Sequence, residues 1–179
     1  MLYRRNHLID QLYTVDGKAE IVNDMIVMDS PTGSMPGRSA AAIYRSRYDY
    51  EVEHGGGYTI VDNVGFIVDL PNCQSFCPDA AWYVGEMTMK FLEGPPVLAV
   101  EVRSEGDYGP AAEEAMALKR IDYFDAGSQV VWDVDLMGLH TVRVYTAENR
   151  EDPRVYSQGD ETEAEPAIPG WRMSVDALF

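Results

Sequence analysis

A strand, a helix and a second strand follow one another between residues 97 and 135, and this unit most restricts the folds open to the chain. Residues 97–102 (VLAVEV) are almost continuously apolar, which is typical of a strand buried on both faces. A helix is predicted from Pro110 to Ala126, because proline suits a first helical turn and Gly127 suits the position after the last. Residues 129–135 (QVVWDVD) predict a second strand. Such a unit within a run of strands implies an α/β fold with a mixed sheet flanked by helices.

Shorter patterns on both sides add a hairpin, a helix and more strands. Asn23 and Asp24 suit the turn of an N-terminal β-hairpin over residues 19–28. The spacing of apolar residues predicts a helix over 38–53, which the glycines at 55–57 end. Further strands are predicted at residues 58–62, 65–70, 80–84 and 140–146. The last of these pairs with the strand at 129–135.

No feature of the sequence divides the chain or places it in a membrane. Without a linker or a shift in composition, a single domain spanning residues 1–179 is expected. No apolar run approaches the roughly 18 residues that a membrane helix needs, and the first ten residues lack the apolar region of a signal peptide. We therefore expect a cytoplasmic protein that does not bind a membrane.

The charge balance is strongly acidic. The chain has 14 basic and 30 acidic side chains, a net charge of −16 with histidine neutral. One acidic stretch, residues 159–166, has the composition of a loop. A general nucleic-acid coat or a binder of anionic membranes needs a basic field, so both classes are disfavoured. An enzyme that reaches a phosphodiester through a carboxylate-bound metal remains compatible with this charge.

Most standard enzyme motifs are missing from the sequence. His7, His54 and His140 lie far apart and have no partner at the spacing of metal ligands. Cys73 and Cys77 could pair, but two thiols form neither a disulfide framework nor a complete zinc site. There is no phosphate-binding glycine loop, no nucleophile elbow and no cysteine–histidine signature.

One constellation of charged residues remains. Asp79 precedes a short strand, Glu101 interrupts the most apolar strand, and Lys119 lies within the following helix. A charge in a buried strand costs several kcal/mol unless it lies at the strand end or binds a cation. Two neighbouring carboxylates suit a hard divalent cation, and a lysine beside them offsets charge that grows on a phosphate. In the structural alternative, Asp79 caps a turn, Glu101 ends a strand and Lys119 extends into solvent.

These residues lie within motifs that resemble the Uma-two family of the PD-(D/E)xK restriction-endonuclease-like superfamily. The resemblance rests on Pro78-Asp79, on VLAVEVRS at 97–104 and on Lys119-x3-Tyr123-x3-Gly127. It continues in the VVWDVD strand and the terminal PGWRMSVDALF, and upstream in AEIV at 19–22 and SPTG at 30–33. The matching motifs occur in the family's order and span roughly residues 17 to 179.

The resemblance implies a restriction-endonuclease-like fold and a set of site residues. Asp79 and Glu101 would hold Mg²⁺ or Mn²⁺, with the backbone carbonyl of Val102 as a third ligand. The superfamily's lysine usually lies two residues after the glutamate, where this chain has Arg103, and the family takes it instead from the helix, here Lys119. Glu20 would be an accessory acid near the metal. One position departs from the family pattern: Pro36 stands where a histidine commonly precedes Gly-Arg.

Two functions follow from these residues. The first is a metal-dependent endonuclease, a hydrolase that cleaves DNA phosphodiester bonds with DNA as a transient substrate. The alternative is a catalytically silent, dimeric restriction-endonuclease-like module that binds a partner. The apolar closing segment, with Trp171, Met173, Leu178 and Phe179, packs either on the domain or in a homodimer interface.

Overall fold

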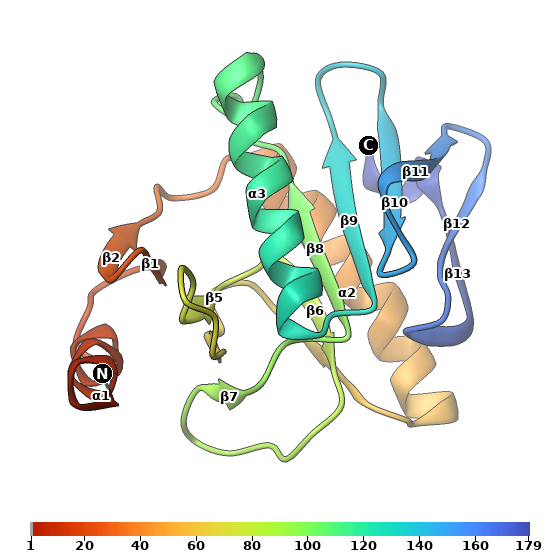
Figure 1. Cartoon of the computed structure of the whole chain (residues 1–179). Helices are drawn as coiled ribbons and strands as arrows, with labels where there is room; N and C mark the ends of the chain where they lie inside the picture. Colours follow the sequence, from red (N-terminus) through yellow and green to blue (C-terminus); the bar gives the residue numbers. More distant parts are fainter. Residues whose placement is uncertain (1) are drawn as a thin grey trace.

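A six-stranded mixed sheet forms the centre of the molecule (Figure 1). The computed structural model describes residues 2–179, with side chains from residue 7 onward. Strands β8 and β9 are parallel and all other neighbours are antiparallel, in the order β11-β10-β9-β8-β6-β3. The strands are β3 (Tyr58–Ile60), β6 (Ala80–Tyr83), β8 (Leu98–Val102), β9 (Val130–Asp135), β10 (Thr141–Thr146) and β11 (Asn149–Ser157). The predicted mixed sheet is confirmed.

Two helices cover opposite faces of this sheet, as Figure 1 shows: α2 (Ser34–His54) and α3 (Pro110–Ala126). Alternation along β8 sends Leu98 and Val100 into the core shared with α2, and Ala99 into the core shared with Tyr123 of α3. Glu101 has the same parity as Ala99, so its side chain lies on the α3 face. The predicted α3 boundaries are those observed, while α2 begins four residues before its predicted start.

The closing segment folds back on the core of its own chain. Residues 161–164, predicted as loop, form β12 (Glu161–Ala164), which pairs with β13 (Ile168–Ser174) before the short 3-10 helix η1 (Val175–Leu178). Trp171 is buried and stacks on Trp132 of the sheet at 5.3 Å between ring centroids. Of the two predicted locations for this segment, packing on the domain is the one observed.

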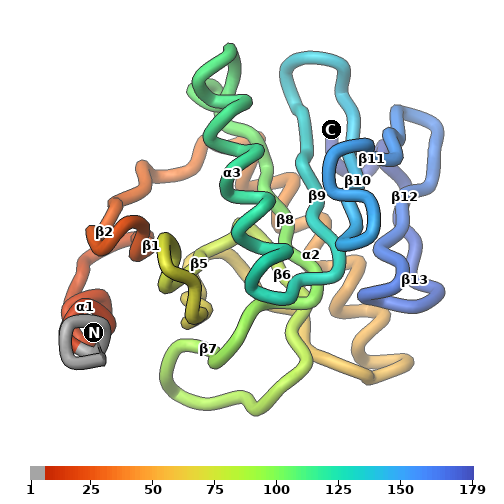
Figure 2. The backbone as a smooth tube through the Cα atoms, viewed as in Figure 1, coloured from red at the N-terminus to blue at the C-terminus, as the bar shows by residue number. Residues whose placement is uncertain are grey.

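An N-terminal unit lies at the opposite edge of the molecule from this C-terminal hairpin (Figure 2). It consists of α1 (Leu2–Leu12) and the hairpin of β1 (Ala19–Val22) and β2 (Met25–Met28). Asn23 and Asp24 have φ angles of 51° and 57°, the left-handed conformation that a two-residue hairpin turn requires. The predicted hairpin is confirmed.

A small second sheet connects this hairpin to the main sheet. It contains β4 (Phe66–Ile67), β5 (Ser75–Phe76) and β7 (Leu92–Glu93), so the predicted strand at 65–70 is short and lies outside the main sheet. Backbone hydrogen bonds from Asn23 to Asn72 (2.8 Å) and from Gln74 to Ile21 (2.9 Å) hold β1 against this region. This docking brings Glu20 of β1 to Lys119 of α3, while Ala19 and Ile21 pack in a core with residues of α1.

Two further observations concern the cysteines and the helices. Cys73 and Cys77 are both free, buried thiols. Within residues 2–179, no helix combines the length and the apolar character needed to cross a lipid bilayer.

Candidate active site

The antiparallel pairing of β6 with β8 brings Asp79 next to Glu101. Ala80 is in register with Val100, so the residue before β6 lies beside the last residues of β8. Asp79 donates its backbone N–H to the Val100 carbonyl (3.1 Å), and its Oδ2 accepts the Val102 N–H (2.7 Å). The Asp79 carboxylate therefore lies against the backbone that carries Glu101.

Glu101 is bound by two side chains of α3. Tyr123 donates its hydroxyl to Glu101 Oε1 at 2.6 Å, and Lys119 Nζ lies 3.0 Å from the same oxygen. The two α3 residues are four positions apart and therefore share one helix face. Lys119 points to the carboxylates and not to open solvent, unlike in the structural alternative.

Glu20 reaches the same lysine from β1. Its Oε1 accepts the Cys77 N–H at 2.6 Å and lies 3.1 Å from Lys119 Nζ. Lys119 thus bridges Glu20 and Glu101, which belong to different sheets. The structure brings together all four side chains that the sequence singled out.

A second lysine, Lys18, contacts the Asp79 carboxylate; the sequence analysis did not identify it as a site residue. Lys18 Nζ is 2.7 Å from Asp79 Oδ1 and 2.9 Å from Asp62 Oδ1. Lys18 precedes β1 by one residue and has the same parity as Glu20, so the period of two along a strand was a signal that could have found it. Tyr123 was likewise named only as a motif residue, although its spacing from Lys119 places it in the site.

Burial and the neighbouring charges shift the pKa values of Glu101 and Lys119. Burial raises the pKa of Glu101 to about 7; Asp79 and Glu20 add to this rise, and Lys119 opposes it. Burial alone would lower the pKa of Lys119, but Glu101 and Glu20 outweigh it and hold that pKa well above its usual value. Lys119 therefore stays protonated at neutral pH, and a neighbouring cation stabilises the Glu101 carboxylate.

The cluster opens into a cavity of about 580 Å³. Lys18, Asp79, Glu101 and Lys119 all line it, and residues 28–32, which follow β2, form part of its wall. Within residues 7–179, no three His, Cys, Asp or Glu side chains converge as a ready-made metal cluster. Asp79 and Glu101 are the carboxylates of the cluster that face the cavity, and Asp29, which follows β2, adds a further carboxylate to its lining.

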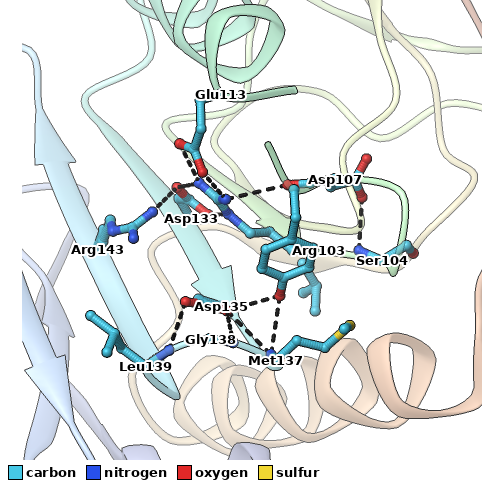
Figure 3. A network of polar contacts seen from close by, with 12 residues as sticks. Arg103, Ser104, Asp107, Glu113, Asp133, Asp135, Met137, Gly138, Leu139 and Arg143 are labelled. Atoms are coloured by element: carbon cyan, nitrogen blue, oxygen red, sulfur yellow. Dashed lines mark hydrogen bonds and ion pairs between the residues drawn. The ribbon is translucent and has the colours of Figure 1, made fainter. Parts of the chain in front are cut away.

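Arg103, at the position of the superfamily's usual lysine, belongs to a separate network of ion pairs and hydrogen bonds (Figure 3). Its guanidinium makes two bonds to Asp133, from Nε (2.6 Å) and from NH2 (2.7 Å), and also pairs with Glu113 at the start of α3. Arg143 contacts Asp133 from β10 at 3.2 Å. The Arg103 side chain is 1% exposed, and its ion pairs link the end of β8 to β9 and α3.

A mixed sheet covered by helices, with a carboxylate pair where β6 begins and β8 ends, has the architecture of restriction-endonuclease-like proteins. Residues 8–176 match the model of the Uma2 family, described as "Putative restriction endonuclease". The chain belongs to this family, so its function is nuclease-like.

A solved structure supports the same fold. It is the crystal structure of "a putative nuclease belonging to DUF820" from Anabaena variabilis ATCC 29413, with a TM-score of 0.75 and 14% sequence identity. The similarity covers 96% of each chain. Among curated proteins, none matches the sequence.

Proposed function

We propose that the protein is a metal-dependent endonuclease that hydrolyses DNA phosphodiester bonds. The observation that carries this proposal is the contact of Lys119 with Glu101 beside Asp79, at the mouth of a cavity. A lysine held on a carboxylate pair supplies positive charge where a phosphate would gain negative charge. Membership in a family described as restriction endonucleases, and a similar fold in a protein described as a nuclease, support the same reaction.

The residues present fit Mg²⁺ or Mn²⁺. Both ions prefer oxygen ligands, and Asp79 and Glu101 offer carboxylate oxygens. The Val102 N–H points to Asp79, and the N–H and C=O of one strand residue point to the same side, so the Val102 carbonyl supports the pair as a third ligand. The raised pKa of Glu101 indicates a carboxylate that a cation would stabilise.

A bound divalent cation would supply Lewis-acid polarisation of the phosphate and a water of lowered pKa. The protein's own groups do the rest of the work. Lys119, which is protonated at neutral pH, orients the attacking water and offsets the charge that develops on the phosphate oxygens. Tyr123 is a positioning residue, because its hydroxyl fixes the Glu101 carboxylate. Glu20 holds Lys119 from the opposite side as an accessory acid.

Lys18 gives the site a second property. Its ammonium lies on Asp79 Oδ1, where it neutralises a carboxylate that would otherwise face Glu101 and Glu20. A divalent cation that binds Asp79 must share this carboxylate with Lys18 or displace its ammonium. Lys18 therefore lowers the affinity of the site for the cation.

A cleavage screen with matched variants tests the proposal. Single-stranded, duplex and branched DNA are incubated with Mn²⁺ and the wild-type protein, and Mn²⁺ binding is titrated by calorimetry. Asp79→Ala and Glu101→Ala should lose both Mn²⁺ binding and cleavage. Asp152→Ala, which removes an exposed carboxylate of β11, should change neither. Wild-type protein that binds Mn²⁺ yet cleaves none of these substrates would favour the silent binding module.

A further inference from the structure

A second, smaller cavity adjoins the carboxylate cluster. It has a volume of about 240 Å³ and lies between the N-terminal half of α2 and the residues that follow β3. Its lining consists of Thr32, Pro36, Gly37, Ala40, Ala41, Tyr44, Val61, Asp62 and Asp79. Thr32 and Asp79 also line the larger cavity, so the two cavities adjoin at the carboxylate that the proposed metal would bind.

The two ends of this smaller cavity differ in chemistry. Asp62 and Asp79, at the end shared with the cluster, are bridged by Lys18. Apart from Thr32, the remaining wall is apolar or aromatic, with Tyr44 from α2 and Val61 from the residues after β3. Tyr44 stacks on Tyr48, one turn further along α2, at 5.9 Å between centroids and 11° between ring planes. This stacking favours one orientation of the Tyr44 ring.

The size and charge of the cavity restrict its ligand. Its volume lies below the roughly 300–1,000 Å³ typical of pockets for drug-sized molecules, which suits a single small ring system. An apolar wall that ends in two carboxylates does not stabilise a second phosphate. A nucleobase is uncharged and offers a π-face for an aromatic side chain.

The charge of the whole chain favours the same ligand. With a net charge of −16, the protein has little capacity to hold DNA by neutralising a series of phosphates. Stacking of a base on an aromatic side chain supplies affinity that does not depend on a basic surface.

We propose that the cavity between α2 and the residues after β3 binds one unstacked nucleobase of the strand whose phosphate is cleaved beside Asp79. This inference rests on the proposed nuclease function and names its substrate class. In an intact duplex every base is paired and stacked, so moving one into the cavity costs a few kcal/mol, and least where the base is already single-stranded. The substrate is therefore single-stranded or frayed DNA, and not an intact duplex.

Binding and cleavage of one oligonucleotide series test this assignment. Three kinds of DNA are compared: a labelled single strand, a set of copies of that strand that each carry one abasic position, and the matching duplex. Each is titrated with Ca²⁺ present and then cleaved with Mn²⁺. Tyr44→Ala should weaken single-strand binding by roughly tenfold, the effect of losing one stacked base. Ala41→Leu, which fills the cavity and keeps Tyr44, should do the same. Tyr58→Ala, which removes an exposed tyrosine of β3 outside the cavity, should not.

The abasic strand supplies the decisive comparison. The wild type should lose about as much affinity for the best-placed abasic strand as Tyr44→Ala loses for the intact one, and the two losses should not add. Equal binding of the intact strand by wild type, Tyr44→Ala and Ala41→Leu, or preferential cleavage of the duplex, would overturn the base assignment while leaving the nuclease intact. Absence of any cleavage by wild type is the separate failure of the proposed function, and absence of strand binding overturns the base assignment as well.

Discussion

Lys119 Nζ lies 3.0 Å from Glu101 Oε1, and the two residues belong to elements that follow one another in the chain, β8 and α3. One strand–helix connection therefore builds half of the site. Asp79 arrives through the antiparallel partner β6, and Glu20 through the docked N-terminal hairpin. The cluster is thus assembled only when the main sheet, the N-terminal hairpin and α3 are in place.

Replacing Lys119 should separate catalysis from metal binding. A protonated ammonium cannot ligate a cation, so Lys119→Ala should leave Mn²⁺ affinity equal or slightly higher. Cleavage should fall by roughly two to three powers of ten, the usual loss when one transition-state charge partner is removed. Lys119→Arg should restore only part of it, because a planar guanidinium differs in shape from a compact ammonium.

The matched control for this experiment is Lys90→Ala. Lys90 is exposed and outside both cavities, so its removal should alter neither quantity. Undiminished cleavage by Lys119→Ala, with Asp79→Ala inactive, would remove Lys119 from the mechanism.

The fold was predictable where burial imposes a strong periodic pattern. The apolar run of β8, the helix signals of α3 and the buried β9 predict the correct order, with the α3 bounds as observed and each strand beginning one residue later than predicted. The strand at 149–157 escaped prediction because it is a sheet edge, and its mostly exposed side chains carry no apolar period. The acidic residues 161–164 form a strand that pairs with β13, and the buried Glu163 carboxylate lies 2.7 Å from Arg154; composition alone reveals neither contact.

The site was predictable to the extent that its residues lie in recognisable motifs. Asp79, Glu101 and Lys119 were selected from strand and helix context together with the family resemblance, and they converge. Their catalytic roles, and that of Glu20, stay predictions. Lys18 was not selected, because its place beside Asp79 depends on how the N-terminal hairpin docks. The period of two along the strand places Lys18 on the same face as Glu20, but its contact with Asp79 is a tertiary relationship between the hairpin and the main sheet.

Lys18 leads to a second prediction, on metal affinity. Lys18→Met keeps most of the side-chain stem and removes the ammonium that occupies Asp79. A charged hydrogen bond in a partly buried site contributes ~1.5–3 kcal/mol, so its removal should raise Mn²⁺ affinity by about tenfold or more. Calorimetric titration of Lys18→Met beside Lys90→Met measures this change. A fall in Mn²⁺ affinity would mean that Lys18 supports the metal site and does not compete with the cation.

Asp135 at the end of β9 gives a prediction on acid stability (Figure 3). Burial alone would raise its pKa, but hydrogen bonds from Gly138, Leu139, Tyr108 and Met137 lower it to about 2, from an ordinary value of 3.8. Because the folded-state pKa is depressed, this stabilisation is fully present above pH 4 and is lost as the pH falls through about 2. The free energy involved is about 2.5 kcal/mol.

Asp135→Asn should therefore be less stable than wild type at pH 7 by ~1–3 kcal/mol, and the difference should shrink towards zero between pH 4 and pH 2. Urea denaturation across this range measures both curves. A difference that stays constant with pH would show that the carboxylate charge contributes nothing and that only hydrogen-bond geometry matters.

Arg47 on α2 leads to the last prediction, a gain in stability. Its side chain is fully buried, and none of its three guanidinium nitrogens has a hydrogen-bond partner among the described residues. Burial lowers its pKa to about 9, so it still carries its charge at pH 7. An unpaired polar group in a core costs ~1–3 kcal/mol, and an unpaired charge costs more.

Arg47→Met fills similar space without the charge and should raise the free energy of unfolding by at least ~1 kcal/mol in urea denaturation at pH 7. Arg45→Met, at an exposed position of the same helix, should change it by less than ~0.5 kcal/mol. Destabilisation by Arg47→Met alone would mean that the guanidinium stabilises the fold despite its burial.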